Sequence, residues 1–198
     1  STFFMNTYDL IQDMTFSQAR DWTAGAKLTY HVKDWFSVTG SLHADFYDRF
    51  KRHERIDTRN KDYESSIWQP RLTITSNYFD GHSLIFGVEH TSDELTSDRF
   101  SGNANHDLKT RALKETEYFL QDEWTINPKW MVSAGLRTNF SKAFGFMGMP
   151  KIAAKYSPNE RWSIRANYSM GYRSPSIKEL FFNWDHLGMF MIRGNENM

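Results

Sequence analysis

Histidine and cysteine are the side chains that most often bind transition metals in proteins. This sequence has seven histidines and no cysteine. Without cysteine the chain has no disulfide, no thiolate metal site and no cysteine nucleophile. His31, His43 and His90 each stand singly in extended segments, without a second ligand at a metal-binding spacing. His186 lies in an aromatic-rich stretch near the C-terminus, and its spacing alone indicates only an ordinary loop histidine.

Catalytic patterns are equally sparse. The sequence has no glycine-rich phosphate loop and no nucleophile elbow, and its scattered Ser, His and Asp residues do not define a triad. Asp93, Glu94 and Asp98 approach a predicted loop, but without the spaced oxygen ligands of a calcium loop. The basic run 49–55, which contains His53, is either a solvated loop or a contact for lipid phosphates or an acidic ligand. We expect no enzyme activity and no intrinsic cofactor.

Composition narrows the fold class. The 198 residues carry 24 basic and 24 acidic side chains, and this neutral balance argues against a nucleic-acid partner. No uninterrupted apolar run exceeds that of Met189–Ile192, so a transmembrane helix is excluded. A mean hydropathy of −0.66 combined with 16% aromatic residues fits a membrane β-barrel as well as a soluble all-β domain.

Alternation of apolar and polar residues runs along most of the chain. It is clear from Trp22 to Val32 and again from Trp162 to Met170, where every second residue is apolar. Short polar connections at 33–34, 80–81, 127–129 and 157–160 join successive alternating segments. The pattern predicts about eight antiparallel strands in four up-and-down hairpins.

Three features favour a transmembrane barrel over a soluble two-layer sandwich. The predicted strands reach about ten residues, the length of a tilted bilayer crossing, and aromatic residues gather near their ends. The connections between hairpins are predicted to be longer and polar, at 51–65, 100–109, 141–149 and beyond Tyr172. One row of side chains is hard to bury in a dry core and suits a wet lumen. That row contains Lys27, His31, Arg71, Arg137, Lys155 and Arg165.

Several stretches resemble the barrel of TonB-dependent outer-membrane receptors. They are Glu117–Trp124, Pro150–Tyr156 with Trp162–Ala166, and Gly171–Ser176 followed by Lys178–Phe181. The resemblance implies part of a 22-stranded barrel in the bacterial outer membrane, in contact with its lipid. It also implies a plug domain and a TonB-type energy-transducing protein as partners in a longer parent. The sequence shows neither a plug nor a signal-peptide pattern, so we interpret it as a fragment.

The resemblance gives the chain one expected domain organisation. Residues 1–198 form a partial barrel, in which 1–19 are a preceding strand or loop, 20–171 the strands and 172–198 an extracellular loop. An incomplete barrel leaves two unpaired strand edges, which predicts self-association or pairing with another chain.

A finer resemblance concerns haem receptors of the same family. Tyr172-Arg173-Ser174-Pro175 is similar to their first box, Asn195–Met198 loosely to their second, and His186 lies between the two. The resemblance implies haem or a haemoprotein as ligand, with His186 on the haem iron. It also implies that Trp184 covers the macrocycle, and that Tyr172, Arg173 and Arg193 belong to the same binding site, where the arginines pair with propionates.

Other functions stay open. A ferric siderophore or cobalamin would be the cargo of other receptors of this family. From different classes, about eight strands suffice for a small self-closing structural or adhesin barrel, and a soluble all-β binding module would bury the apolar rows in a dry core.

Overall fold

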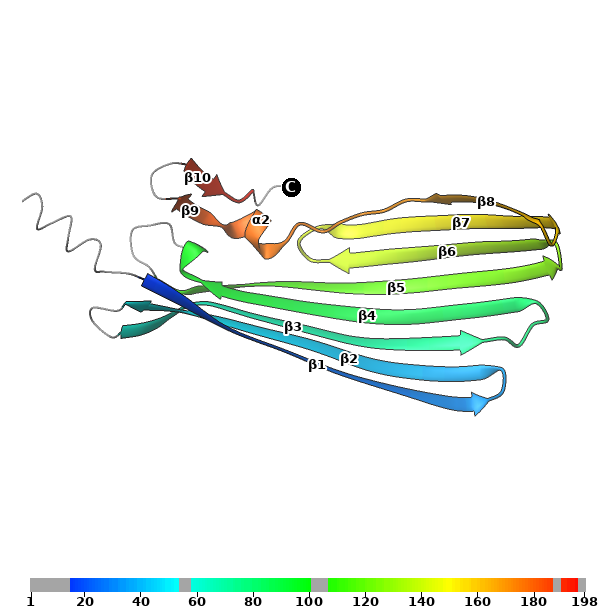
Figure 1. Cartoon of the computed structure of the whole chain (residues 1–198), viewed down its shortest axis with the longest axis horizontal. Coiled ribbons are helices and arrows are strands. Elements are labelled where there is room, and N and C mark those ends of the chain that lie inside the picture. The colour runs from blue at the N-terminus through cyan, green and yellow to red at the C-terminus, as the bar shows by residue number, and fades with distance from the viewer. Residues whose placement is uncertain (1–14, 54–57, 101–106, 187–189, 196–198) are drawn as a thin grey trace, which may run out of the picture.

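The computed structural model describes residues 15–53, 58–100, 107–186 and 190–195. Eight long strands form one antiparallel sheet whose spatial order is the sequence order (Figure 1). They are β1 (Thr15–Lys33), β2 (Phe36–His53), β3 (Thr58–Ser76), β4 (His82–Ser97), β5 (Lys109–Asn127), β6 (Trp130–Ser141), β7 (Gly145–Asn159) and β8 (Trp162–Ser169). The smaller elements are the 3-10 turn η1 (Asp98–Phe100), the helix α2 (Ile177–Phe181), and a hairpin of β9 (Asn183–His186) with β10 (Phe190–Arg193). The prediction of up-and-down antiparallel strands is confirmed.

Tight turns join β1 to β2, β3 to β4, β5 to β6 and β7 to β8 at one end of the sheet, here named the turn end. Gly81 has a φ of 74°, in the left-handed region that favours glycine, and lets the chain reverse into β4. The Asn127 side chain accepts hydrogen bonds from the backbone N–H groups of Lys129 (2.9 Å) and Trp130 (3.0 Å). These local signals explain why the β3–β4 and β5–β6 turns could be predicted from the sequence.

The opposite end, here named the loop end, carries the other connections together with α2, β9 and β10 (Figure 1). Two of these connections are shorter than predicted. β2 runs to His53 and β3 begins at Thr58, whereas β7 begins at Gly145, whose φ of 76° closes a tight turn after β6. The expected loops 51–65 and 141–149 are therefore wrong. Strands of up to 19 residues continue beyond the roughly ten that a bilayer crossing needs.

The two faces of the sheet differ throughout, because successive side chains of a strand point to opposite sides. On the apolar face, Phe86 pairs with Leu120, and Leu120 with Leu136. Large exposed hydrophobic residues on this face include Trp22, Leu28, Tyr30, Leu42, Trp68, Leu72, Tyr118, Trp124, Ile152, Ile164 and Tyr168. On the polar face, one row crosses six strands through Lys27, Ser41, Arg71, Glu89, Glu117 and Asn139.

Charges on the polar face are paired across strands. The guanidinium of Arg71 lies 3.4 Å from the Glu89 carboxylate and 4.6 Å from the Phe119 ring centre, and Arg137 pairs with Glu117. A Cβ at Gly87 would collide with the Phe119 ring, so this glycine makes room for it. The face is thus an ordered polar wall, as the alternation predicts.

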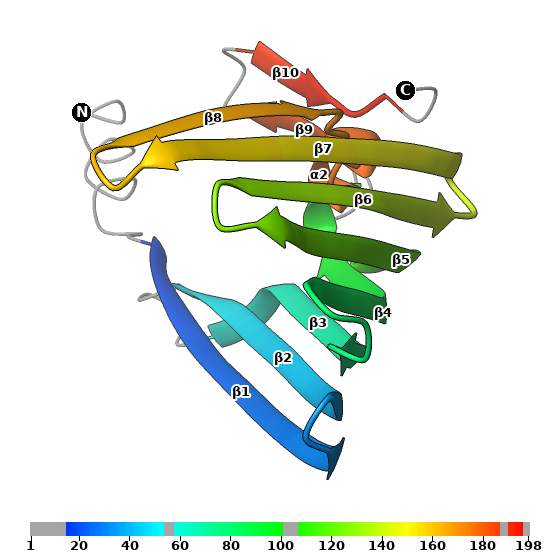
Figure 2. The same cartoon turned by 90° about the vertical axis from the view of Figure 1, so that its right-hand side faces the viewer.

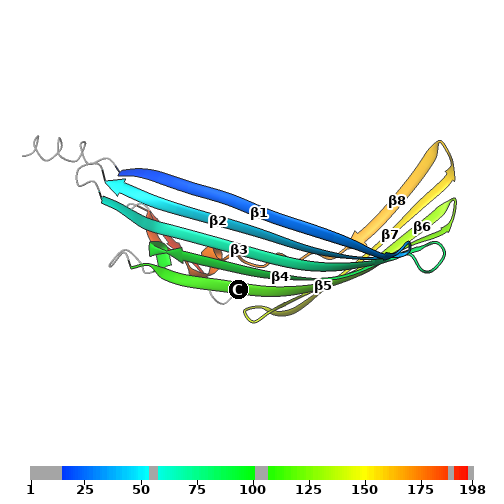
Figure 3. The ribbon, with the colours of Figure 1, turned by 90° about the horizontal axis from the view of Figure 1, so that it is seen from below.

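The sheet is a single curved layer that stays open (Figure 2). Figure 3 shows the same long strands from below, running together from the turn end to the loop end. Within the described residues, β1 and β8 each have one neighbour in the sheet and do not pair with each other. The small self-closing barrel and the two-layer sandwich both disagree with this arrangement. Across these residues, no helix is long and apolar enough to cross a membrane.

Candidate ligand-binding site

The helix α2 covers the polar face of the sheet at the loop end. Its Ile177 and Leu180 are 2% and 3% exposed. They belong to a hydrophobic cluster drawn from β3, β4, η1, β5 and the segment after β8. Its buried members are Tyr63, Leu95, Phe100, Leu113, Ile177, Leu180 and Phe182. The polar face of the sheet is therefore accessible to solvent along most of its length, and it has a packed hydrophobic core where α2 lies on it.

A capping box fixes the start of α2. The backbone N–H of Ser176 donates to the Glu179 carboxylate (2.7 Å), and the backbone N–H of Glu179 donates to the Ser176 hydroxyl (3.3 Å). The guanidinium of Arg173 donates to the other carboxylate oxygen of Glu179 (2.6 Å). The backbone bond from Ser176, followed by the Arg173 and Ser176 side chains, lowers the pKa of Glu179 to about 2.

The end of the β9–β10 hairpin is attached to α2. The backbone N–H of Gly194 donates to the Phe182 carbonyl (2.5 Å), and that of Asn195 donates to the Glu179 carbonyl (3.0 Å). A Cβ at Gly194 would collide with the backbone at Leu180. Only glycine permits this close approach, so the C-terminal segment forms a folded cover at the loop end.

Cations stack on aromatic rings beneath this cover. The Arg49 guanidinium lies 5.3 Å from the Tyr63 ring centre, and the Lys178 ammonium, from α2, lies 5.2 Å from the same ring. The Arg99 guanidinium lies 5.9 Å from the Phe182 ring centre. A cavity of about 320 Å³ opens among these groups. Its lining contains three cations and no carboxylate: Tyr47, Arg49, Tyr63, Ser65, Arg99, Lys178 and Phe182.

A nearly buried carboxylate holds Arg49, one of the cations of this cavity. Asp62, 4% exposed, accepts bonds from the Arg49 Nη2 (2.7 Å) and Nε (3.2 Å) atoms and lies 3.4 Å from the Lys51 ammonium. Lys51 in turn lies 3.2 Å from Asp98. Burial and the like charge of Arg49 lower the pKa of Arg99, although a guanidinium stays protonated in proteins. The site is a cationic and aromatic surface suited to an anion with flat, unsaturated groups.

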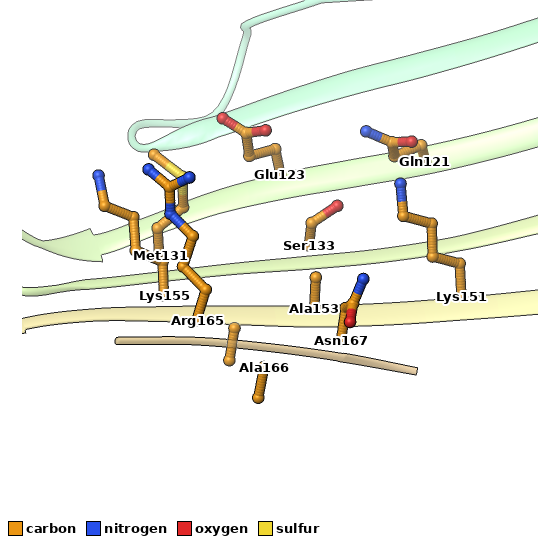
Figure 4. Close-up of a pocket in the computed structure, with 11 residues that line it drawn as sticks. Gln121, Glu123, Met131, Ser133, Lys151, Ala153, Lys155, Arg165, Ala166 and Asn167 are labelled. Carbon is orange, nitrogen blue, oxygen red and sulfur yellow. The ribbon is translucent and has the colours of Figure 1, made fainter. Parts of the chain in front are cut away.

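A second, larger cavity of about 500 Å³ lies on the polar face near the turn end. Figure 4 shows Lys155 and Arg165 side by side near Met131, with Glu123 and Lys151 on the same side of the sheet. No ion pair joins these four charged side chains in the described structure. This cavity is open, whereas the one at the loop end is built around paired charges.

The structure describes the side chains of only some of the predicted haem residues, and it places those in separate segments of the chain. Arg173 binds Glu179, and Tyr172 is half-buried beside it in the chain. In the β9–β10 hairpin, Arg193 pairs with Asn183 and His186 with Phe190, at opposite ends of the ladder. The side chains of Trp184 and His186 lie outside the described residues, as do 196–198 of the second box. No cluster of three metal-binding side chains occurs in the parts of the chain that can be described.

Sequence reasoning found only Arg49 of the cation–aromatic site, within the basic run 49–55, and missed its other members. The members of this site come from β2, β3, η1, α2 and the residue after α2. Because these segments are far apart in the sequence, no short motif predicts that they form one site. The helix that supplies Lys178 did have a local signal, because Ser176 followed three residues later by Glu179 is a capping-box pattern.

Comparison with known proteins identifies the family. A family described as "TonB dependent receptor-like, beta-barrel" matches residues 2–198. The chain belongs to this family. Its members are receptor barrels of the bacterial outer membrane, so the predicted family and location are confirmed, and the apolar face is the lipid-facing surface.

Curated relatives share the same setting. The iron-regulated outer membrane virulence protein of Vibrio cholerae serotype O1, in two strains, is 23% identical over 174 residues. The match takes in 85% of this chain and 24% of the relative, so the chain spans about a quarter of that relative's length.

Solved structures agree on the fold. A mutant of the ferric enterobactin receptor of Pseudomonas aeruginosa superposes with a TM-score of 0.74 at 14% identity, over 91% of this chain and 31% of that one. The siderophore receptor PirA of the same organism gives a TM-score of 0.59 at 14% identity, over 91% and 40%. At these identities the likeness concerns the fold alone.

Proposed function

We propose that this chain is a wall segment of an outer-membrane receptor that takes up iron as an anionic ferric siderophore. The observation that carries the proposal is the loop-end cavity, lined by three cations and three aromatic rings without a carboxylate. A ferric catecholate complex presents negative charge on aromatic rings, and guanidinium and ammonium groups attract both features. The relatives named for iron regulation and for ferric enterobactin support the same class of cargo.

Lys178 is the cation best placed to meet such a ligand. Its ammonium stacks on Tyr63 and has no ion-pair partner among the described residues, whereas Arg49 is held by Asp62. Lys178 also lies on α2, which packs on the polar face by two buried side chains. Ligand binding would therefore tie the C-terminal cover to the barrel wall.

Haem stays the second candidate. It depends on His186 and on the two flanking boxes, and the relatives' names refer to iron and siderophores instead. In either case we propose that the full-length receptor contains a plug inside the barrel and works with a TonB-type protein.

A titration of a full-length receptor that contains this segment tests the proposal. Ferric enterobactin is added to the detergent-solubilised receptor, and binding is followed by quenching of tryptophan fluorescence. We expect Lys178→Ala to weaken binding about tenfold, since a desolvated cation–π and charge contact contributes about 1–2 kcal/mol. Lys155→Ala, at the turn end, is the control and should bind as the unchanged receptor does.

Hemin is titrated in parallel with His186→Ala. Two results together would make haem the cargo in place of the siderophore. The unchanged receptor would bind hemin tightly, and His186→Ala would weaken that binding and change the hemin absorbance. Ferric enterobactin would bind weakly, and equally to Lys178→Ala and Lys155→Ala. Equal hemin spectra with and without His186 would remove this residue from the site.

A further inference from the structure

A groove of about 400 Å³ lies on the apolar face between β4, β5 and β6, close to the loop end. His90, Thr116 and Phe140 line it and are direct neighbours in the sheet, since His90 pairs with Thr116 and Thr116 with Phe140. Lys114, on β5, and Lys142, in the turn after β6, complete its rim, and each lies two positions beyond the groove residue Thr116 or Phe140 toward the loop end. The groove thus faces away from the lumen and from the proposed cargo site.

Its height on the barrel wall follows from the register. Phe86, Leu120 and Leu136 form an apolar row four residues closer to the turn end on each of the three strands. Four residues of strand amount to about 13 Å. The groove therefore lies where the lipid-facing apolar band gives way to polar side chains, and its two lysines stand on the extracellular side of that boundary.

The groove combines a positive rim with an apolar wall. Lys114 and Lys142 are exposed, and neither forms an ion pair within the described structure. The Nδ1 atom of His90 lies 2.9 Å from the Thr116 hydroxyl, which fixes the imidazole against β5. Phe140 is 56% exposed. The carboxylate on this face near the lysines is the exposed Glu94, which lies on β4 two residues beyond the pairing partner of Lys114.

We propose that this groove binds the phosphorylated headgroup of an outer-leaflet glycolipid. The two ammonium groups contact the phosphate from the water side, and an acyl chain runs down over Phe140 toward the apolar band. A soluble anion would contact the lysines but not the exposed Phe140 ring below them. A membrane lipid at this depth would contact the lysines with its phosphate and the ring with its acyl chain. The inference is independent of the cargo and gives the barrel wall a lipid-binding role.

Thermal unfolding of the full-length receptor in dodecyl maltoside micelles tests this site. Because a ligand that binds only the folded state stabilises it by RT ln(1 + [L]/Kd), the rise of the unfolding midpoint with ligand concentration gives an apparent affinity. The probe is diphosphoryl lipid A. We expect Lys114→Gln with Lys142→Gln to weaken its apparent affinity at least tenfold, and higher ionic strength to weaken binding to the unchanged receptor.

Matched variants and ligands separate the alternatives. Lys151→Gln with Lys155→Gln removes the same charge from the polar face and should leave the lipid A affinity unchanged. Dephosphorylated lipid A and inorganic phosphate should each raise the midpoint less than the intact probe.

Three results would overturn the proposal. Equal affinity for dephosphorylated lipid A would leave only an apolar contact, and an equal effect of inorganic phosphate would leave only an anion site. An equal loss in the polar-face control would mean that net charge, and not this groove, decides binding.

Discussion

The two cavities of the polar face lie in the same sheet but are built differently. At the loop end, Asp62 holds Arg49 and Lys51, and α2 covers the cluster with two buried side chains. At the turn end, Lys155 and Arg165 point into open space without an ion-pair partner among the described residues. The comparison shows that residues of this chain organise the loop-end site, whereas no helix or loop among the described residues covers the turn-end cavity.

The largest effect should come from removing the carboxylate that holds the loop-end cations. Asp62→Asn takes the nearly buried carboxylate from Arg49, whose side chain is 21% exposed, and from Lys51, which is 36% exposed and keeps Asp98. Breaking a fully buried pair costs about 3–5 kcal/mol, and the partial exposure of both cations reduces that cost. We expect the free energy of unfolding of the full-length receptor to fall by about 2 kcal/mol, as measured by urea titration in detergent micelles.

Glu64→Gln is the matched control for Asp62→Asn. The Glu64 side chain is 52% exposed and lies 2.7 Å from the Lys61 ammonium, so its loss should change the unfolding free energy by less than about 0.5 kcal/mol. If both variants cost the same, the loop end is no better organised than the solvated surface, and the contrast between the two cavities fails.

A smaller effect should follow from acid at the cap of α2. Because the folded pKa of Glu179, about 2, lies below its ordinary value of 4.5, its stabilising effect is fully present above about pH 4.5. That effect is lost as the pH falls toward 2. Pepsin should therefore cut the 177–182 segment of the receptor faster as the pH falls from 4 to 2, relative to a free peptide of the same sequence.

Glu179→Gln separates this local event from general acid unfolding. The variant should be cut at pH 4 as readily as the unchanged receptor is cut near pH 2, and its relative cutting rate should depend little on pH. A variant that keeps the same acid dependence would show that another group controls the cover.

The sequence predicted the sheet well because alternation and turns are local signals. The rows through Trp22 and Lys27 and the turns at Gly81 and Asn127 appear where the pattern places them. One lipid-facing row contains an exception, since Asp122 stands among apolar residues and its carboxylate lies 2.8 Å from His82. Only the cross-strand register shows that this acid has a partner.

The loop lengths and the cation–aromatic site were less accessible. β2 and β3 stay paired into the expected loop through a register shift between Arg49 and Phe50, and this pairing joins residues that are distant in the sequence. The cavity needs five separate segments to meet, and the family motif drew attention to His186 and Arg173 instead. Of these two, the side chain of Arg173 is described, and it supports the cap of α2.

The smallest effect is expected at the turn end, and it sharpens the comparison most directly. Lys155 has no ion pair in the described structure, so Lys155→Gln should change the free energy of unfolding of the full-length receptor by less than about 0.5 kcal/mol if that cavity stays open. A loss above about 1.5 kcal/mol would mean that a segment outside this chain places a carboxylate against Lys155. The same urea titration measures both outcomes, with Lys129→Gln, at the β5–β6 turn, as the control for removing one exposed charge near this end of the sheet.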